Sequence, residues 1–230
     1  LAGNAGAQAT DATDGSVVTF DKTAPVFTAV TSVSNNTYDP SLSMVGDIVT
    51  VTMVASEITQ APDVTIGGSL GTVTGSGTTW TAVRALTADD TEGAVTLSID
   101  YLDLAGNAGV QATAATDGSV ITFDKTVPTF TTLSMASNNA NTVYAMVGDI
   151  VTVTMVTSEI TQAPDITIGG SLGTVTGSDT TWTAVRTLTA DDTEGAVTLS
   201  IDYLDLVGNA GEQTTATTDG SVVTFDKTVP

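Results

Sequence analysis

Acidic side chains are the residues of this chain that are best placed to do chemistry. The chain contains neither cysteine nor histidine, which excludes thiolate and imidazole metal ligands and catalysis by either group. It carries 26 aspartates and glutamates against five lysines and arginines, for a formal net charge of -21. Oxygen ligands therefore remain, and these suit hard cations such as Ca²⁺.

The candidate ligands recur as two sets that are spaced 102 or 103 residues apart along the chain. The first set is Asp21, Glu57, Asp103 and Asn107, and the second is Asp124, Glu159, Asp205 and Asn209. If folding gathers each set at one end of a domain, its carboxylates repel one another. A cation with six to eight oxygen ligands would remove that repulsion, and Ca²⁺ fits better than Mg²⁺, which needs a smaller and stricter octahedron. The alternative is that these are solvated turn residues.

A further acidic turn carries Asp89, Asp90 and Glu92. We expect this turn at the opposite end of its domain, beside the exit to the next domain, where Asp89 and Asp90 are additional candidate ligands for the second set. The competing interpretation is an ordinary exposed turn. Asn209 has its own alternative, because its side chain could instead cap its own turn through an Asx hydrogen bond.

The recurrence of these residues follows from an internal repeat. Residues 46–128 and 148–230 align without a gap and differ at nine of 83 positions, and residues 1–20 match 104–123. Such self-similarity indicates a window on a longer array. The predicted domains are 1–20, the C-terminal strand of a preceding repeat; 21–123 and 124–226, two complete repeats; and 227–230, the start of the next.

Each repeat has the sequence pattern of short strands. Apolar residues alternate with threonine or serine over Val49–Met53 and Val95–Tyr101, which predicts half-buried strands. Further β-rich runs, separated by Gly, Asn, Asp and Pro, are Val26–Val33, Val64–Ile66, Gly71–Thr74, Thr79–Leu86 and Ser119–Phe123. No segment has a helical period. The prediction is all-β, with tandem immunoglobulin-like β-sandwiches arranged in line.

The composition also excludes several classes of binding partner. Phosphate backbones and anionic membrane surfaces would repel this acidic chain, so binding to nucleic acids and binding to anionic membranes are both excluded. No apolar stretch approaches the roughly 18 residues of a membrane span, so no direct membrane insertion is expected. Near-identical copies without a private aromatic cleft argue against an enzyme. Trp80 and Trp182 are expected in the core, with sugar stacking as the alternative.

The order of three motifs carries a resemblance to a known family. DKTxP, then VGDIVTVTMxxSE, then DLxGN resembles the bacterial Ig-like repeats of giant surface adhesins and biofilm-associated proteins, and the likeness covers residues 21–226. The resemblance implies extracellular modules that are exported by type I secretion, act as spacers and bind calcium at domain junctions. These are expectations for this chain.

Two functions follow as hypotheses. The first is a structural extender of a large secreted cell-surface adhesin, stiffened by calcium at domain junctions, which projects a distal binding domain and has the neighbouring repeats of the same chain as partners. The alternative is a self-assembling subunit of an extracellular filament or sheath, in which residues 1–20 add as a strand to a neighbouring chain. Lateral or end-to-end self-association belongs to this second hypothesis.

Overall fold

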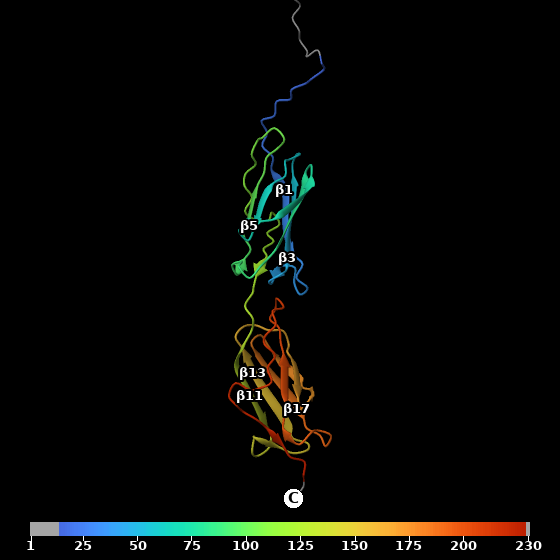
Figure 1. Cartoon of the computed structure of the whole chain (residues 1–230), viewed down its shortest axis with the longest axis vertical. Coiled ribbons are helices and arrows are strands. Elements are labelled where there is room, and N and C mark those ends of the chain that lie inside the picture. Colours follow the sequence, from blue (N-terminus) through green and yellow to red (C-terminus); the bar gives the residue numbers. More distant parts are fainter. Residues whose placement is uncertain (1–13, 229–230) are drawn as a thin grey trace, which may run out of the picture. The chain divides into compact units, whose positions relative to one another are not determined.

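The computed structural model describes residues 14–228, and within that range the fold consists of strands and loops (Figure 1). No helix among these residues is long and apolar enough to cross a membrane. By their own contacts the residues divide into two compact units. The first combines the chain up to residue 31 with 51–83 and 96–118, and the second combines 32–50, 84–95 and the chain from 119 onward.

The second repeat lies wholly within the second unit. Its strands are β11 (Phe130–Ser137), β12 (Tyr144–Ala145), β13 (Ile150–Thr157), β14 (Asp165–Ile168), β15 (Ser171–Leu172), β16 (Thr174–Ser178), β17 (Thr181–Thr187), β18 (Gly195–Ala196), β19 (Leu199–Asp202) and β20 (Thr224–Phe225). They form a four-stranded sheet in the order β11-β13-β17-β16 and two three-stranded sheets, β12-β20-β18 and β15-β14-β19.

The core of the second repeat is built by the alternation of side chains along these strands. In β13, Val151, Val153 and Met155 are fully buried while the residues between them are not. They join one apolar cluster with Ile166 of β14 and Ile201 of β19. Side chains of the four-stranded sheet therefore pack against those of the smaller sheets, as in a β-sandwich.

The first repeat has the same elements in the same order. Its strands are β1 (Phe27–Ser34), β2 (Leu42–Ser43), β3 (Ile48–Ala55), β4 (Asp63–Ile66), β5 (Ser69–Leu70), β6 (Thr72–Ser76), β7 (Thr79–Ala85), β8 (Gly93–Ala94), β9 (Leu97–Asp100) and β10 (Thr122–Phe123). The sheet orders are β1-β3-β7-β6, β2-β10-β8 and β5-β4-β9. The expected tandem immunoglobulin-like β-sandwiches are thus confirmed as the fold class.

The predicted strands match the structure best where the alternation is strongest. Val49–Met53 lies inside β3, whereas Val95–Tyr101 contains only the short β9, and Ser119–Phe123 only the two residues of β10. Trp80 is 9% exposed and donates its Nε1 hydrogen to Thr59 Oγ1 at 2.8 Å. Its counterpart Trp182 is 8% exposed, so both indoles lie in the core as expected.

The predicted strand at residues 1–20 lies partly outside the described residues, and so do 229 and 230. Asp14–Phe20 forms no strand, and Val18 and Phe20 are 95% and 86% exposed. Their counterparts in the first repeat, Ile121 and Phe123, are 2% and 1% exposed. The domain boundaries at residues 20, 123 and 226 stay predictions.

Candidate metal centre

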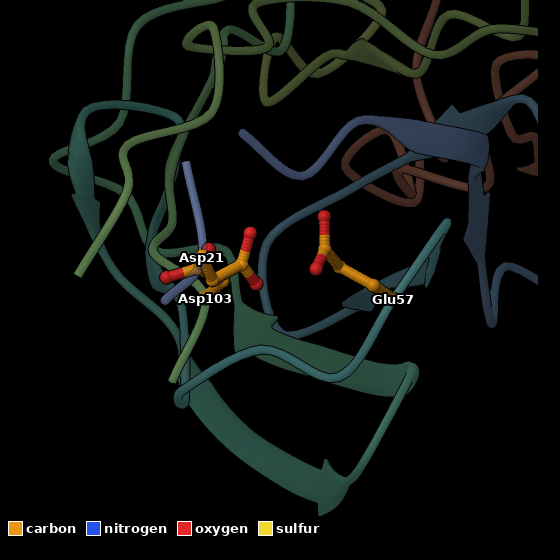
Figure 2. A group of neighbouring side chains, drawn as sticks. All are labelled: Asp21, Glu57 and Asp103. Atoms are coloured by element: carbon orange, nitrogen blue, oxygen red, sulfur yellow. The ribbon is translucent and has the colours of Figure 1, made fainter. Parts of the chain in front are cut away.

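Two groups of three carboxylates lie close together, one in each unit. In each group one oxygen from every member lies within 4.8 Å of the others. The first group is Asp21, Glu57 and Asp103, and Figure 2 shows the carboxylate of Glu57 facing the two aspartates. The second group is Asp124, Glu159 and Asp205. Ca²⁺–oxygen bonds of about 2.3–2.6 Å would allow one ion to reach three oxygens so spaced.

Three separate segments supply the second group. Asp124 directly follows β10, Glu159 lies two residues after β13, and Asp205 lies three residues after β19. Ser158, beside Glu159, donates its N–H to the Thr129 carbonyl at 2.8 Å and accepts from the Thr129 N–H at 3.0 Å. These bonds tie the end of β13 to the residue before β11. The carboxylate of Glu159 is thereby held beside the segment that contains Asp124.

The loop Asp205–Asn209 wraps its backbone around the first carboxylate of the motif. Asp205 Oδ1 accepts from the N–H groups of Val207, Gly208 and Asn209 at 2.8, 2.6 and 2.8 Å. Gly208 has a φ of 108°, a conformation that side chains with a Cβ rarely adopt. Asp205 is only 2% exposed. This buried carboxylate is therefore fixed in orientation.

The side chain of Asn209 links two members of the group. Its Nδ2 donates to Asp205 Oδ2 at 2.8 Å and to the backbone carbonyl of Asp124 at 3.2 Å. This is not the Asx bond considered for Asn209, in which its side-chain oxygen would accept an N–H of its own turn; the Asx bond of this loop is made by Asp205, whose Oδ1 accepts from the Val207 N–H. Asn209 also bonds to the preceding segment. The structure gives Asn209 the geometry of a positioning residue for the carboxylates.

Glu159 is the least satisfied member of the second group. Its Oε1 is buried and has no hydrogen-bond partner among the described residues. Burial raises the pKa of Glu159, and the nearby negative charges of Asp124, Asp205 and Glu92 raise it further. The pKa of Asp124 is also raised, first by burial and then by Asp205 and Glu92. Such carboxylates favour either a proton or a cation.

Glu92 brings a fourth carboxylate to this neighbourhood. Its Oε1 accepts from the Lys125 N–H at 2.9 Å and from Thr126 Oγ1 at 2.7 Å, which lowers its pKa. Lys125 itself directs Nζ to the carbonyls of Ala88 and Asp90. A cleft of about 370 Å³ adjoins the group; its lining residues are Glu92, Gly93, Thr122, Phe123, Asp124, Thr126, Ser158 and Glu159.

The first group repeats this arrangement with the counterpart residues. Asp103 is 1% exposed, and its two carboxylate oxygens accept from the N–H and Nδ2 of Asn107 at 2.8 and 2.7 Å. Burial alone would raise the pKa of Asp103, but the hydrogen bonds from this loop outweigh it and lower the pKa. Burial raises the pKa of Glu57, and Asp21 and Asp103 add to the effect.

Asp89 and Asp90 are not among the grouped carboxylates. Asp90 is 7% exposed and forms an ion pair with Arg84 at 2.8 Å, while its other oxygen accepts from the Thr87 N–H at 2.7 Å. Both of its oxygens are thus already in use. Asp89 is exposed. Asp192 repeats the ion pair with Arg186 at 2.6 Å. In both repeats, therefore, the buried aspartate stabilises its own turn.

Sequence reasoning did not give weight to two features of the site. Glu92 was counted with its turn but not as a candidate ligand, although the structure places it beside Asp124. The pairing of Arg84 with Asp90 was also missed. A usable signal was present, because Arg84 is the one arginine of its repeat and Thr87 precedes Asp90 by three residues, a spacing at which side-chain hydroxyls close turns.

Comparison with known proteins gives little beyond architecture. No family model matches the chain, and no curated protein sequence matches it. The crystal structure of Rst D1-D2 aligns with a TM-score of 0.36 and 11% identity, over 90% of this chain and 100% of that one. The Bacteroides ovatus protein SGBP-B of a mixed-linkage glucan utilization locus, solved with a mixed-linkage heptasaccharide, aligns with a TM-score of 0.24 and 16% identity. That alignment covers 84% of this chain and 45% of SGBP-B. At these scores neither structure bears on the function of this chain.

Proposed function

We propose that this chain is a run of structural spacer repeats from a large extracellular adhesin, and that its two carboxylate groups bind Ca²⁺. The observation that supports the cation most directly is Glu159 Oε1, a buried oxygen without a partner among the described residues. One carboxylate oxygen of Glu159 lies within 4.8 Å of an oxygen of Asp124 and of an oxygen of Asp205. Burying an unpaired carboxylate beside like charges is costly, and a hard cation would offset that cost.

The proposed ligands of the second site are Asp124, Glu159 and Asp205, with Glu92 as a fourth carboxylate, either directly or through a water. Asn209 positions the aspartates and is not needed as a ligand. The first site uses Asp21, Glu57 and Asp103, with Asn107 in the positioning role. Asp90 is left out because it is outside both groups and is paired with the cationic side chain of Arg84, and Asp89 because it is also outside both groups.

A bound cation would restrain the chain where one repeat leads into the next. Asp124 belongs to the segment between β10 and β11, whereas Glu159 and Asp205 follow β13 and β19 of the second repeat. Extracellular Ca²⁺ modules typically bind at about 10⁻⁴ to 10⁻³ M. Free ion at roughly ten times the dissociation constant adds about 1.4 kcal/mol of stability per site. Repeated along an array, this would stiffen a spacer whose length grows with the number of copies.

The test compares calcium with chelator by calorimetry and small-angle scattering on the whole chain. We expect calcium to raise the melting temperature and to narrow the distribution of chain dimensions. Glu159→Gln and Asp205→Asn should reduce both effects, while Asp89→Asn, which removes a charge outside the group, should retain them. Identical melting temperatures and scattering with calcium and with chelator would show that these are solvated acidic patches.

A second candidate, assembly by strand addition, would act through residues 1–20. Val18 and Phe20 are almost fully exposed, although Ile121 and Phe123 at the equivalent positions are buried. These two side chains would be buried if the segment were the closing strand of a preceding repeat or of another chain. Sedimentation separates the two: association that rises with concentration and is lost in Phe20→Asp supports assembly, and a monomer at every concentration rejects it.

A further inference from the structure

The two repeats differ most in the loop that follows their first strand. Both loops begin with Ser-Asn-Asn and end at Met-Val-Gly-Asp, but the first repeat has one residue more between these motifs. Two residues after this shared start, the first loop has an aromatic residue, Tyr38. The second repeat has Ala140 and Asn141 in this part of its loop. Tyr38 is therefore particular to the first repeat.

Tyr38 lies against the glycine of the Asp205–Asn209 loop, and both belong to the second unit. A Cβ added to Gly208 would collide with the ring, with Cδ2 at 2.9 Å. The matching Gly106 has a similar φ, 95° against 108°, yet has no atom within 4 Å of the same position. Among the described residues no counterpart of the Tyr38 loop lies before the first repeat, so Gly106 shows the same turn without a ring against it.

Asn36 fixes the position of Tyr38 and makes a second contact with the same loop. It is 8% exposed, and its Oδ1 accepts from the Tyr38 N–H at 2.9 Å. Its Nδ2 donates to Asp47 at 2.8 Å and to the backbone carbonyl of Val207 at 2.8 Å. The counterpart Asn139 repeats the bond to its own aspartate, Asp149, at 2.8 Å. The bond to Val207 is thus an addition to a shared loop structure.

Val207 is one of the nine positions at which the aligned repeats differ, and it is 5% exposed. A residue particular to the second repeat is therefore buried next to a loop particular to the first. From this pairing we propose that Asn36 and Tyr38 form a docking site for the Val207–Gly208 loop, built from a tyrosine that the second repeat lacks at this place and a valine that the first repeat lacks. This contact joins the two repeats without requiring a cation.

The ring itself supplies the test. Proton NMR of the whole chain in chelator should show the Hα signals of Gly208 displaced from those of Gly106 by the ring current of Tyr38. Tyr38→Leu should remove the difference, and Tyr144→Leu should leave it, since Tyr144 is equally exposed at 51% against 50%. Equal Gly208 and Gly106 shifts in the unaltered chain would overturn the proposal.

A second measurement tests the contact through its effect on stability. Gly208→Ala should lower the melting temperature more than Gly106→Ala, because both strain a positive φ but only the former meets the ring. Combining Gly208→Ala with Tyr38→Leu should recover part of that loss. Equal losses for the two glycine variants would mean that the Tyr38 ring does not hold the Gly208 loop, and the proposal would then be rejected.

Discussion

Asn209 joins Asp205 to the preceding segment by donating to the carboxylate of Asp205 and to the backbone carbonyl of Asp124. The first repeat has the same pair of bonds, from Asn107 to Asp103 at 2.7 Å and to the carbonyl of Asp21 at 3.3 Å. In both places a neutral amide brings two mutually repelling aspartates together. The asparagine thus stabilises the group whether or not a cation is bound.

We expect Asn209→Ala to lower the free energy of unfolding by about 2 kcal/mol in chelator, since hydrogen bonds to charged groups contribute roughly 1.5–3 kcal/mol. Urea unfolding followed by tryptophan fluorescence measures the change. Asn141→Ala serves as the control because Asn141 is an exposed loop residue. Equal stability of the two variants would show that the amide does not position the aspartates.

Much of this arrangement could be predicted from the sequence because it depends on periodicity. The alternation in Val49–Met53 identifies β3, and the repeat alignment transfers each assignment to the second copy. The gathering of Glu57 and Asp103 follows from the topology of a sandwich, in which successive loops fall at alternate ends. These are properties of the backbone pattern, which the sequence records directly.

The parts that could not be predicted depend on side-chain direction within turns. Asp89 and Asp90 are adjacent and chemically identical, yet only Asp90 turns inward to Arg84. The sequence likewise gives no sign that the Tyr38 ring lies against Gly208, a contact that only the structure shows. Neither residue has a periodic signal, because one residue of difference in a turn redirects a side chain completely.

The raised pKa of Glu159 predicts a pH dependence in chelator. A raised carboxyl pKa means that the folded state binds the proton more tightly than the unfolded state. Between the ordinary value of 4.5 and the raised value, this group therefore makes the protein less stable as the pH rises. We expect melting temperatures measured across this window to fall with increasing pH, and Glu159→Gln to flatten the slope.

Saturating calcium should reverse this contribution, because the ion competes with the proton for the same carboxylates.

The buried Asp90 and Asp192 change their contribution to stability over a different pH range. Burial opposes their ionisation, but hydrogen bonds from Thr87 or Thr189 and the paired arginine lower their pKa below 3.8. Their stabilisation is complete above that value and is lost at more acidic pH. For the first of these predictions, an unchanged slope of melting temperature against pH in Glu159→Gln would show that Glu159 does not cause that slope.

The Arg186–Asp192 pair is expected to stabilise the second repeat substantially. Its side chains are 13% and 8% exposed, and Asp192 also accepts from the Thr189 N–H at 2.7 Å. Asp192→Ala leaves a largely buried guanidinium without its partner, so we expect a loss of at least about 2 kcal/mol. Thermal unfolding compares it with Asp191→Ala, the exposed neighbour. Equal losses would argue against a structural role for the pair.

One like-charge pair offers a stabilising substitution. Asp165 and Asp202 lie directly opposite each other on β14 and β19, as do Asp63 and Asp100 in the first repeat. Like charges at such positions destabilise a sheet. Asp202 is also held by Gln213, whose Nε2 donates to its two carboxylate oxygens at 2.8 and 3.1 Å. Asp165 is therefore the member to replace.

We expect Asp165→Thr to raise the free energy of unfolding by about 0.5 kcal/mol at low salt, since it removes the repulsion and introduces a residue that favours strands. The part of this gain that comes from repulsion should shrink in high salt, because exposed charges are screened. Asp191→Thr removes a charge from an exposed turn and is the matched control. Thermal unfolding of both variants at low and high salt checks the prediction. A gain from Asp165→Thr that is no larger than the control's at low salt would mean that Asp202 and Asp165 do not repel appreciably across the strands.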